Sequence, residues 1–124
     1  MPKFTHLHVH THFSMLDGMS KIPDLVDKCQ RTGMHSIAIT DHGNMYGIKE
    51  FKDYCNKVNK EISDKIKDQK KILESEDASP EDKTSAQNEI DKLGTQFFKP
   101  IIGTEAYCAH KDCHEKDGRG WHLI

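Results

Sequence analysis

The fold is decided by one stretch, His6-Leu7-His8-Val9-His10-Thr11-His12, in which histidine alternates with other side chains. This period of two is typical of a β-strand. The alternation already begins at Phe4, so it predicts a strand over residues 4–9. Alternate side chains on a strand share one face and lie about 6–7 Å apart, so two neighbouring imidazoles can reach a common metal ion. Four of them would span about 20 Å, so we expect two or three to bind metal and the outer ones to lie at the surface. A solvent-facing histidine run is the alternative, but Leu7 and Val9 favour a strand with a buried side.

A second motif, Thr40-Asp41-His42-Gly43-Asn44, directly follows a β-branched run over residues 36–40 that predicts another strand. In parallel α/β folds, ligands bind at the carboxyl ends of strands, where we expect both His10 and His42 to lie. Asp41 is then a candidate to orient a neighbouring ligand from behind. Taken alone, the motif is equally well explained as a loop cap.

The third motif is Gly103-Thr104-Glu105, which follows a predicted strand over residues 99–103. A carboxylate in an otherwise apolar strand region is costly unless it is paired or bound to a metal, so Glu105 is a candidate ligand. Asp17 and His122 are further candidates at loop or strand-end positions. Taken singly, Asp17 and His122 are each better explained by a structural role.

Between these strands the sequence predicts helices. Residues 60–96 hold seven lysines and ten acidic residues, with sparse apolar residues at helical spacing. Ser79-Pro80 between the two apolar stripes resembles a helix start, so we predict a charged helical hairpin. Its charges are read as a solvated face, and an interaction arm is the less favoured interpretation.

The order of predicted elements, β-α-β-α-hairpin-β-β, favours an α/β architecture with right-handed crossovers and parallel strands. A closed (β/α) barrel needs about 200–250 residues, so the 124 residues of this chain hold only its first units. The chain stops within an apolar strand pattern at residues 121–124, and we therefore expect it to be a piece of a longer domain.

Composition narrows the function classes. With a net charge of −2, no global field draws this chain to DNA or to an anionic membrane. No apolar run is long enough to span a bilayer and no secretory signal opens the chain, so we expect a cytoplasmic protein. The four cysteines form no CxxC pair, and Cys29 and Cys55 fall within apolar helical patterns, which favours free buried thiols for these two. A zinc module is the rival interpretation of one cramped cluster, formed by Cys108, His110, Cys113 and His114.

Together these motifs resemble the PHP (polymerase and histidinol phosphatase) domain at the start of bacterial DNA polymerase III alpha subunits. The resemblance covers nearly the whole chain except residues 60–96, and the motifs occur in the family's order. The longest, Thr40-Asp41-His42-Gly43-Asn44-Met45-Tyr46-Gly47, is more specific to the polymerase than to stand-alone phosphatases of the superfamily. The segments that carry the likeness are residues 6–11, 14–18, 38–47, 99–107 and 121–124.

The resemblance implies that residues 1–124 are the N-terminal fragment of a distorted (β/α)7 PHP barrel, with residues 60–96 as a helical insertion. It also implies a cluster of up to three divalent metal ions, with zinc expected first and manganese or magnesium as alternatives. His12 departs from the family, which often has an acidic residue there. Carried over residue by residue, the implied metal ligands are His8, His10, Asp17, His42, Glu105 and His122.

The function implied by the resemblance belongs to a larger parent enzyme, a DNA-directed DNA polymerase whose nucleotidyl-transfer site lies in later domains. The PHP domain is then expected to act as a metal-dependent phosphoesterase, as in 3′–5′ exonuclease proofreading, or to serve a structural role. Expected partners are DNA and other replisome subunits. The alternative is a stand-alone PHP phosphatase acting on a small phosphate ester. Because an incomplete barrel exposes a strand edge, we also expect the fragment to self-associate.

Overall fold

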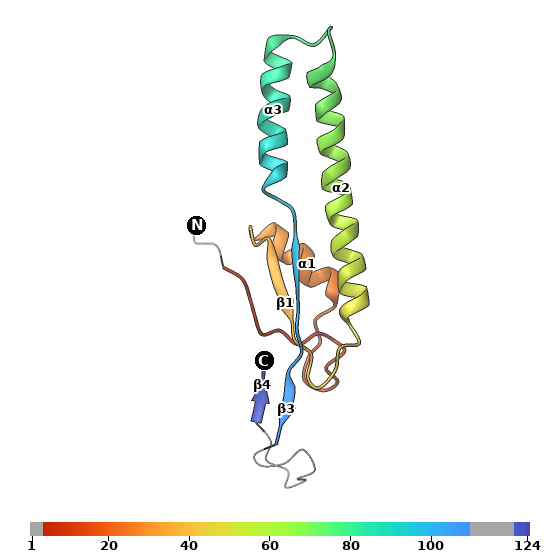
Figure 1. The fold of residues 1–124 in the computed structure, drawn as a ribbon, viewed down its shortest axis with the longest axis vertical. Helices are drawn as coiled ribbons and strands as arrows, with labels where there is room; N and C mark the ends of the chain where they lie inside the picture. Colours follow the sequence, from red (N-terminus) through yellow and green to blue (C-terminus); the bar gives the residue numbers. More distant parts are fainter. Residues whose placement is uncertain (1–3, 110–120) are drawn as a thin grey trace.

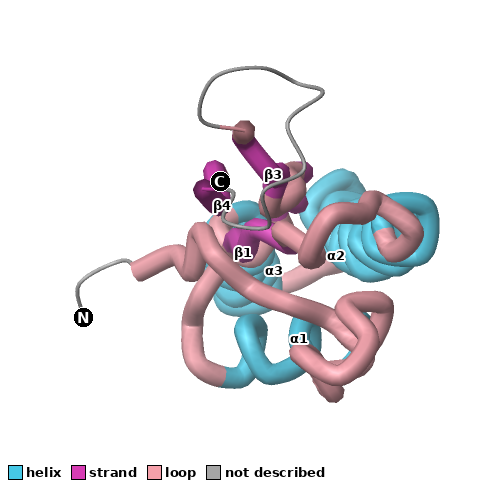
Figure 2. Tube along the Cα trace, turned by 90° about the horizontal axis from the view of Figure 1, so that it is seen from below, coloured by secondary structure: helices cyan, strands magenta, loops and turns pink. Residues whose placement is uncertain are grey.

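The computed structural model describes residues 4–109 and 121–124. A compact lower part carries the strands and the short helix, and a long helical hairpin projects from it (Figure 1). In Figure 2, viewed from below, the hairpin is seen nearly end-on beside the smaller helix, so it runs along the long axis of the molecule. In chain order the elements are α1 (Ile22–Arg31), β1 (Ser36–Ile39), α2 (Ile48–Glu74), α3 (Pro80–Gly94), β2 (Lys99–Ile102), β3 (Ala106–Cys108) and β4 (Trp121–Leu123).

The described strands form two small sheets. Strands β1 and β2 pair in parallel over their whole length, as predicted, from Ser36 with Lys99 to Ile39 with Ile102. Strands β3 and β4 pair antiparallel, so the expectation of parallel strands throughout was wrong for this pair. The connection of residues 109–120 is at the lower limit for a parallel crossover, whereas an antiparallel return needs no such length.

The strand predicted over residues 4–9 is not a regular strand. The segment does run beside β1, because Ala38 N donates to His6 O and Thr40 N donates to Val9 O. Between these two hydrogen bonds the N-terminal segment advances by three residues, whereas the β1 side advances by two. The extra residue interrupts the regular hydrogen-bond ladder, as in a β-bulge. Of the two residues from which a buried side was expected, Val9 is partly buried against the core, whereas Leu7 is 61% exposed.

The core lies where α1 packs against β1, the first half of α2 packs against β2, and the two helices contact each other. Its largest fully buried side chains include Ile22, Ile39, Phe51 and Phe98. Full burial of one such side chain contributes about 1.5–3 kcal/mol, so these contacts hold the strand ends that carry the motifs. The base of α2 is also tied to α1, since the Tyr54 hydroxyl donates to Asp27 Oδ1 at 2.8 Å.

The helical hairpin consists of α2 beyond the core and α3. Residue 60, where the sequence predicted the insertion to begin, lies inside the continuous α2 helix. Ser79 caps α3 as predicted: its hydroxyl accepts from Asp82 N, and the Asp82 carboxylate accepts from Ser79 N, a reciprocal capping box. Ile62 and Leu93 still belong to the buried core, whereas the hairpin beyond them stands clear of it (Figure 1).

None of the helices in the part of the chain that the structure describes is both long and apolar enough to cross a membrane. The buried residues of the long α2 helix form one apolar stripe, from Phe51 to Ile62, and charged residues occupy much of the rest of the helix.

Candidate metal centre

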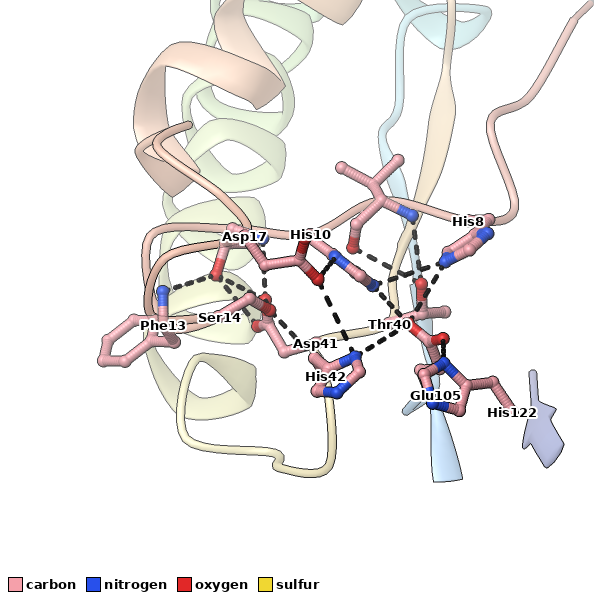
Figure 3. Close-up of polar contacts among 12 residues, drawn as sticks. His8, His10, Phe13, Ser14, Asp17, Thr40, Asp41, His42, Glu105 and His122 are labelled. Carbon is pink, nitrogen blue, oxygen red and sulfur yellow. Dashed lines mark hydrogen bonds and ion pairs between the residues drawn. The ribbon is translucent and has the colours of Figure 1, made fainter. Parts of the chain in front are cut away.

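Ionisable side chains from distant segments gather at the lower rim of the β1–β2 sheet (Figure 3). They come from the N-terminal segment, the loop after it, the end of β1, the end of β2 and strand β4. All six ligands implied by the sequence resemblance point toward one another there: His8, His10, Asp17, His42, Glu105 and His122.

Glu105 lies at the middle of the cluster because the pairing of β1 with β2 continues past both strand ends. An isolated parallel bridge joins His42 to Glu105, with Gly43 N donating to Glu105 O and Glu105 N donating to Asp41 O. This pairing brings the two motifs side by side, although 63 positions separate them in the chain. The Glu105 side chain is only 7% exposed.

The Glu105 carboxylate contacts imidazoles on several sides. Its Oε2 lies 2.5 Å from His10 Nε2, and its Oε1 lies 2.5 Å from His122 Nδ1. Burial raises the pKa of the Glu105 carboxyl, but hydrogen bonds with the surrounding imidazoles, first that of His10, outweigh it and lower the pKa to about 2. Glu105 is therefore an anion at neutral pH, as a metal ligand must be.

Asp17 reaches the cluster through a tight loop. The loop closes back on the N-terminal segment, and a Cβ at Gly18 would lie 2.3 Å from Thr11 O, so only glycine fits there. This close approach brings Asp17 Oδ2 to 2.8 Å from His10 Nδ1. The His10 ring consequently lies between two carboxylates, those of Asp17 and Glu105.

His42 carries a buried nitrogen that makes no hydrogen bond. Its Nδ1 is enclosed and has no hydrogen-bond partner, only longer ion-pair contacts with Glu105 Oε2 at 3.4 Å and Asp17 Oδ2 at 3.7 Å. A buried polar atom without a partner costs about 1–3 kcal/mol. Facing two carboxylates, this nitrogen is placed where a cation would satisfy all three groups.

Asp41 lies behind the centre, as its position beside His42 predicted. Its carboxylate hydrogen-bonds to the loop after the N-terminal segment and not to an imidazole. Its buried carboxylate accepts hydrogen bonds from Thr11 N at 2.6 Å, from the Thr11 hydroxyl, and from the Ser14 hydroxyl at 2.6 Å. The Ser14 oxygen in turn accepts from His42 N at 3.0 Å. This network fixes the loop that runs from His10 to Asp17.

The donor atoms fit a metal ion. Ligand atoms about 2.1 Å from a four-coordinate ion lie roughly 3.4 Å from one another. His8 Nε2 lies 3.3 Å from His10 Nε2 and 3.4 Å from Glu105 Oε2, close to that spacing. Three overlapping groups bring their donor atoms within 4.8 Å of one another and share members, so they form one extended centre: His8, His10 and Glu105; His10, Asp17 and His42; His42, Glu105 and His122.

The outer histidines of the opening stretch lie outside these groups. His6 packs edge-on against Phe4, and His12 stacks beside Phe13. The structure thus brings two of the four imidazoles to the centre, within the two or three that strand geometry allowed. Of the rival zinc cluster, only the exposed Cys108 is described, and His110, Cys113 and His114 lie outside the described residues.

One residue at the centre was missed by the sequence analysis. Tyr107 stands two positions after Glu105, and its ring meets both His42 and His122 with centroids 5.0 Å apart. The spacing of two along a strand was the available signal, since it places Tyr107 and Glu105 on the same face.

Comparison with known proteins bears on this centre. A family model described as "PHP domain" matches residues 6–123 of the chain. The chain belongs to the PHP domain family. A DNA polymerase III subunit alpha from Campylobacter jejuni is 49% identical over 120 residues, which is 96% of this chain and 7% of that protein. This match includes the helical hairpin.

Other polymerase relatives match this PHP chain over shorter stretches. DNA polymerase III subunit alpha of Buchnera aphidicola is 51% identical over 57 residues, covering 46% of this chain and 5% of that protein. The corresponding Helicobacter pylori protein is 52% identical over 48 residues, covering 39% of this chain and 4% of that protein. The chain therefore spans only a small part of the length of the relatives that it matches.

Proposed function

We propose that this chain is the metal-binding part of the PHP domain of a bacterial replicative DNA polymerase, and that its centre serves metal-dependent phosphoester hydrolysis at a DNA 3′ end. The observation that carries the proposal is the convergence of four imidazoles and two carboxylates at one rim of the sheet. The proposed ligands are those of the sequence analysis, His8, His10, Asp17, His42, Glu105 and His122.

The donor set favours zinc. Imidazole nitrogens outnumber carboxylates, which suits zinc, and the same mixture also accommodates manganese. Magnesium prefers oxygen ligands and water, so a centre this rich in histidine is a poorer match for it. Two carboxylates, Asp17 and Glu105, supply enough negative charge to balance one divalent ion.

The centre is buried on the side of Glu105 and open to solvent on the side of His8 and His122. The Glu105 side chain is 7% exposed, whereas those of His8 and His122 are 51% and 45% exposed. A phosphate group can therefore approach from the side of these two histidines. Bound divalent ions supply Lewis acidity at phosphate oxygens and lower the pKa of water. The network of Asp41 keeps Asp17 and His42 in place while the substrate binds.

The polymerase context rests on the relatives, because the chain covers only 7% of the Campylobacter jejuni protein. DNA polymerisation, DNA binding, contacts with replisome subunits and a cytoplasmic location all belong to the proposal. So do the closed (β/α)7 barrel and the role of residues 60–96 as an insertion. The sequence downstream in the parent gene separates this proposal from a stand-alone phosphatase, which would lack polymerase domains.

Metal analysis of the purified chain tests the site. We expect stoichiometric zinc in the wild type and its loss in the double variant His8→Ala/His10→Ala. The matched control is His6→Ala/His12→Ala, which removes two histidines of the same stretch that lie outside the centre. Equal metal content in all three proteins would remove the site assignment. In the cobalt-substituted protein, thiolate charge-transfer bands would instead support the cysteine-containing module.

The activity is tested with the complete parent protein and a 3′-labelled DNA strand. We expect release of mononucleotides that stops with a chelator and in the His8→Ala/His10→Ala variant, while the His6→Ala/His12→Ala variant retains it. A metal-loaded protein that releases no nucleotide would leave a structural role for the centre.

Self-association of the fragment also stays a proposal. Among the described strands, β4 pairs with β3 alone, and its Leu123 is 65% exposed, so this strand is a candidate edge for pairing with another chain. A monodisperse monomer in light scattering would refute it.

A further inference from the structure

The two nitrogens of the His42 ring face different surroundings. Nδ1 points at the carboxylates of Asp17 and Glu105 and makes no hydrogen bond. Nε2 points the other way and is hydrogen-bonded to the Tyr107 hydroxyl. A neutral imidazole has a proton on one nitrogen and a lone pair on the other, so the partner of Nε2 decides what Nδ1 presents to the centre.

Tyr107 is held in this place by its surroundings. Its ring meets His42 edge-on at 85° and His122 at 89°. Gly43 makes room for it: this residue has φ of +64°, and a Cβ there would lie 2.9 Å from Tyr107 Cε2. Backbone pairing of β3 with β4 sets Tyr107 opposite His122, so its ring, although Tyr107 is 61% exposed, contacts an imidazole on each of two sides.

We propose that Tyr107 is a positioning residue for the metal centre. Its phenol oxygen accepts a hydrogen bond from the Nε2–H group of His42, which keeps the proton on Nε2 and the lone pair of Nδ1 directed at the metal. A lone pair that faces two carboxylates is repelled unless a cation lies between them, and a bound metal ion removes that repulsion. Histidine ligands commonly donate their other N–H to a second group in this way, and loss of that group costs roughly 10–100-fold in metal affinity.

This inference rests on the proposed metal site, and the experiment distinguishes failure of the role of Tyr107 from failure of the site itself. The substitution Tyr107→Phe retains the ring and its edge contacts but removes the oxygen. We expect the dissociation constant for zinc, measured by competition with a chromophoric chelator, to rise roughly 10–100-fold. Tyr46→Phe is the matched control, because its side chain is 78% exposed and lies outside the centre, and it should bind zinc like the wild type.

A spectroscopic readout reports the tautomer directly. In the zinc-loaded, 15N-labelled full chain, we expect His42 to show a protonated Nε2 whose N–H signal exchanges slowly with water. The signal should broaden or vanish in Tyr107→Phe and persist in Tyr46→Phe. This measurement on the wild type needs no variant, so it decides even where Tyr107→Phe fails to fold.

The outcomes separate cleanly. A wild-type chain that binds no zinc overturns the proposed metal site itself. Zinc binding with His42 coordinated through Nε2 overturns the role of Tyr107 and leaves the site standing. Equal zinc affinity and equal His42 spectra in the wild type and Tyr107→Phe do the same.

Discussion

Two regions of this molecule are rich in ionisable residues, and they use them differently. On the helical hairpin, lysines pair with acidic residues one turn away on the same helix, as Lys67 does with Asp64 at 3.2 Å and Lys71 with Asp68 at 2.9 Å. At the sheet rim, Glu105 meets histidines that lie 95 and 97 positions away in the chain. The hairpin pairs are exposed, whereas Glu105 is buried.

The difference shows why charge content alone does not locate function. An exposed pair three or four residues apart on a helix contributes about 0.2–0.5 kcal/mol and forms wherever the spacing allows. A carboxylate buried among imidazoles is costly to desolvate, so the fold must compensate it with hydrogen bonds or a cation. We therefore propose that the region with fewer charges, the sheet rim, carries the chemistry.

The largest effect is expected from the core that joins the two regions. Phe51 on α2 is 1% exposed, so Phe51→Ala should lower the free energy of unfolding by about 3–5 kcal/mol. On the same helix but far out on the hairpin, Ile72 is 40% exposed, and Ile72→Ala should cost less than about 1 kcal/mol. Urea denaturation of both variants measures the contrast, and similar losses would contradict it.

A change at the rim comes next. Glu105→Gln keeps the shape but removes the charge shared by two of the three overlapping ligand groups, and we expect zinc affinity to fall at least about 100-fold. Glu89→Gln on the hairpin removes an exposed carboxylate paired with Lys92 at 3.7 Å and should leave the affinity unchanged. Chelator competition compares them. A smaller loss for Glu105→Gln than for Glu89→Gln would show that the centre is wrongly placed.

A smaller effect is expected at the start of α3. Ser79→Ala removes the capping box and should lower stability by about 1 kcal/mol. Hydrogen exchange should show the loss confined to the first turns of α3, with zinc binding as in the wild type. The matched change Ser85→Ala, within the same helix, removes a hydroxyl that caps nothing and should have little effect.

The smallest effect should follow from shortening the hairpin. Replacement of residues 67–89 by a short glycine-serine turn leaves Ile62 and Leu93 in the core. Sites without shared partners act nearly independently, so zinc affinity should change by no more than about twofold. A large loss of affinity would mean that the two regions are coupled, and the comparison between them would fail.

Much of the fold follows from local sequence. Strand periodicity placed β1 and β2, helical periodicity placed α2 and α3, and Ser79-Pro80 marked the start of α3. The same reasoning misjudged the segment of residues 4–9, whose regular alternation conceals one residue too many for a ladder beside β1. The pattern within one segment does not show how many residues the neighbouring strand places between successive hydrogen bonds.

The sequence by itself determined which residues offer imidazole and carboxylate donors and that several of them follow predicted strands. Only the tertiary structure decided that His42 is bridged to Glu105, that the Gly18 turn returns Asp17 to His10, and that Tyr107 faces the outer nitrogen of His42. The physical reason is the distance along the chain over which each effect acts. Periodicity reflects the conformational preferences of residues that are neighbours in sequence. Register and close approach between distant segments depend instead on hydrogen bonds and packing that form only when the whole chain folds.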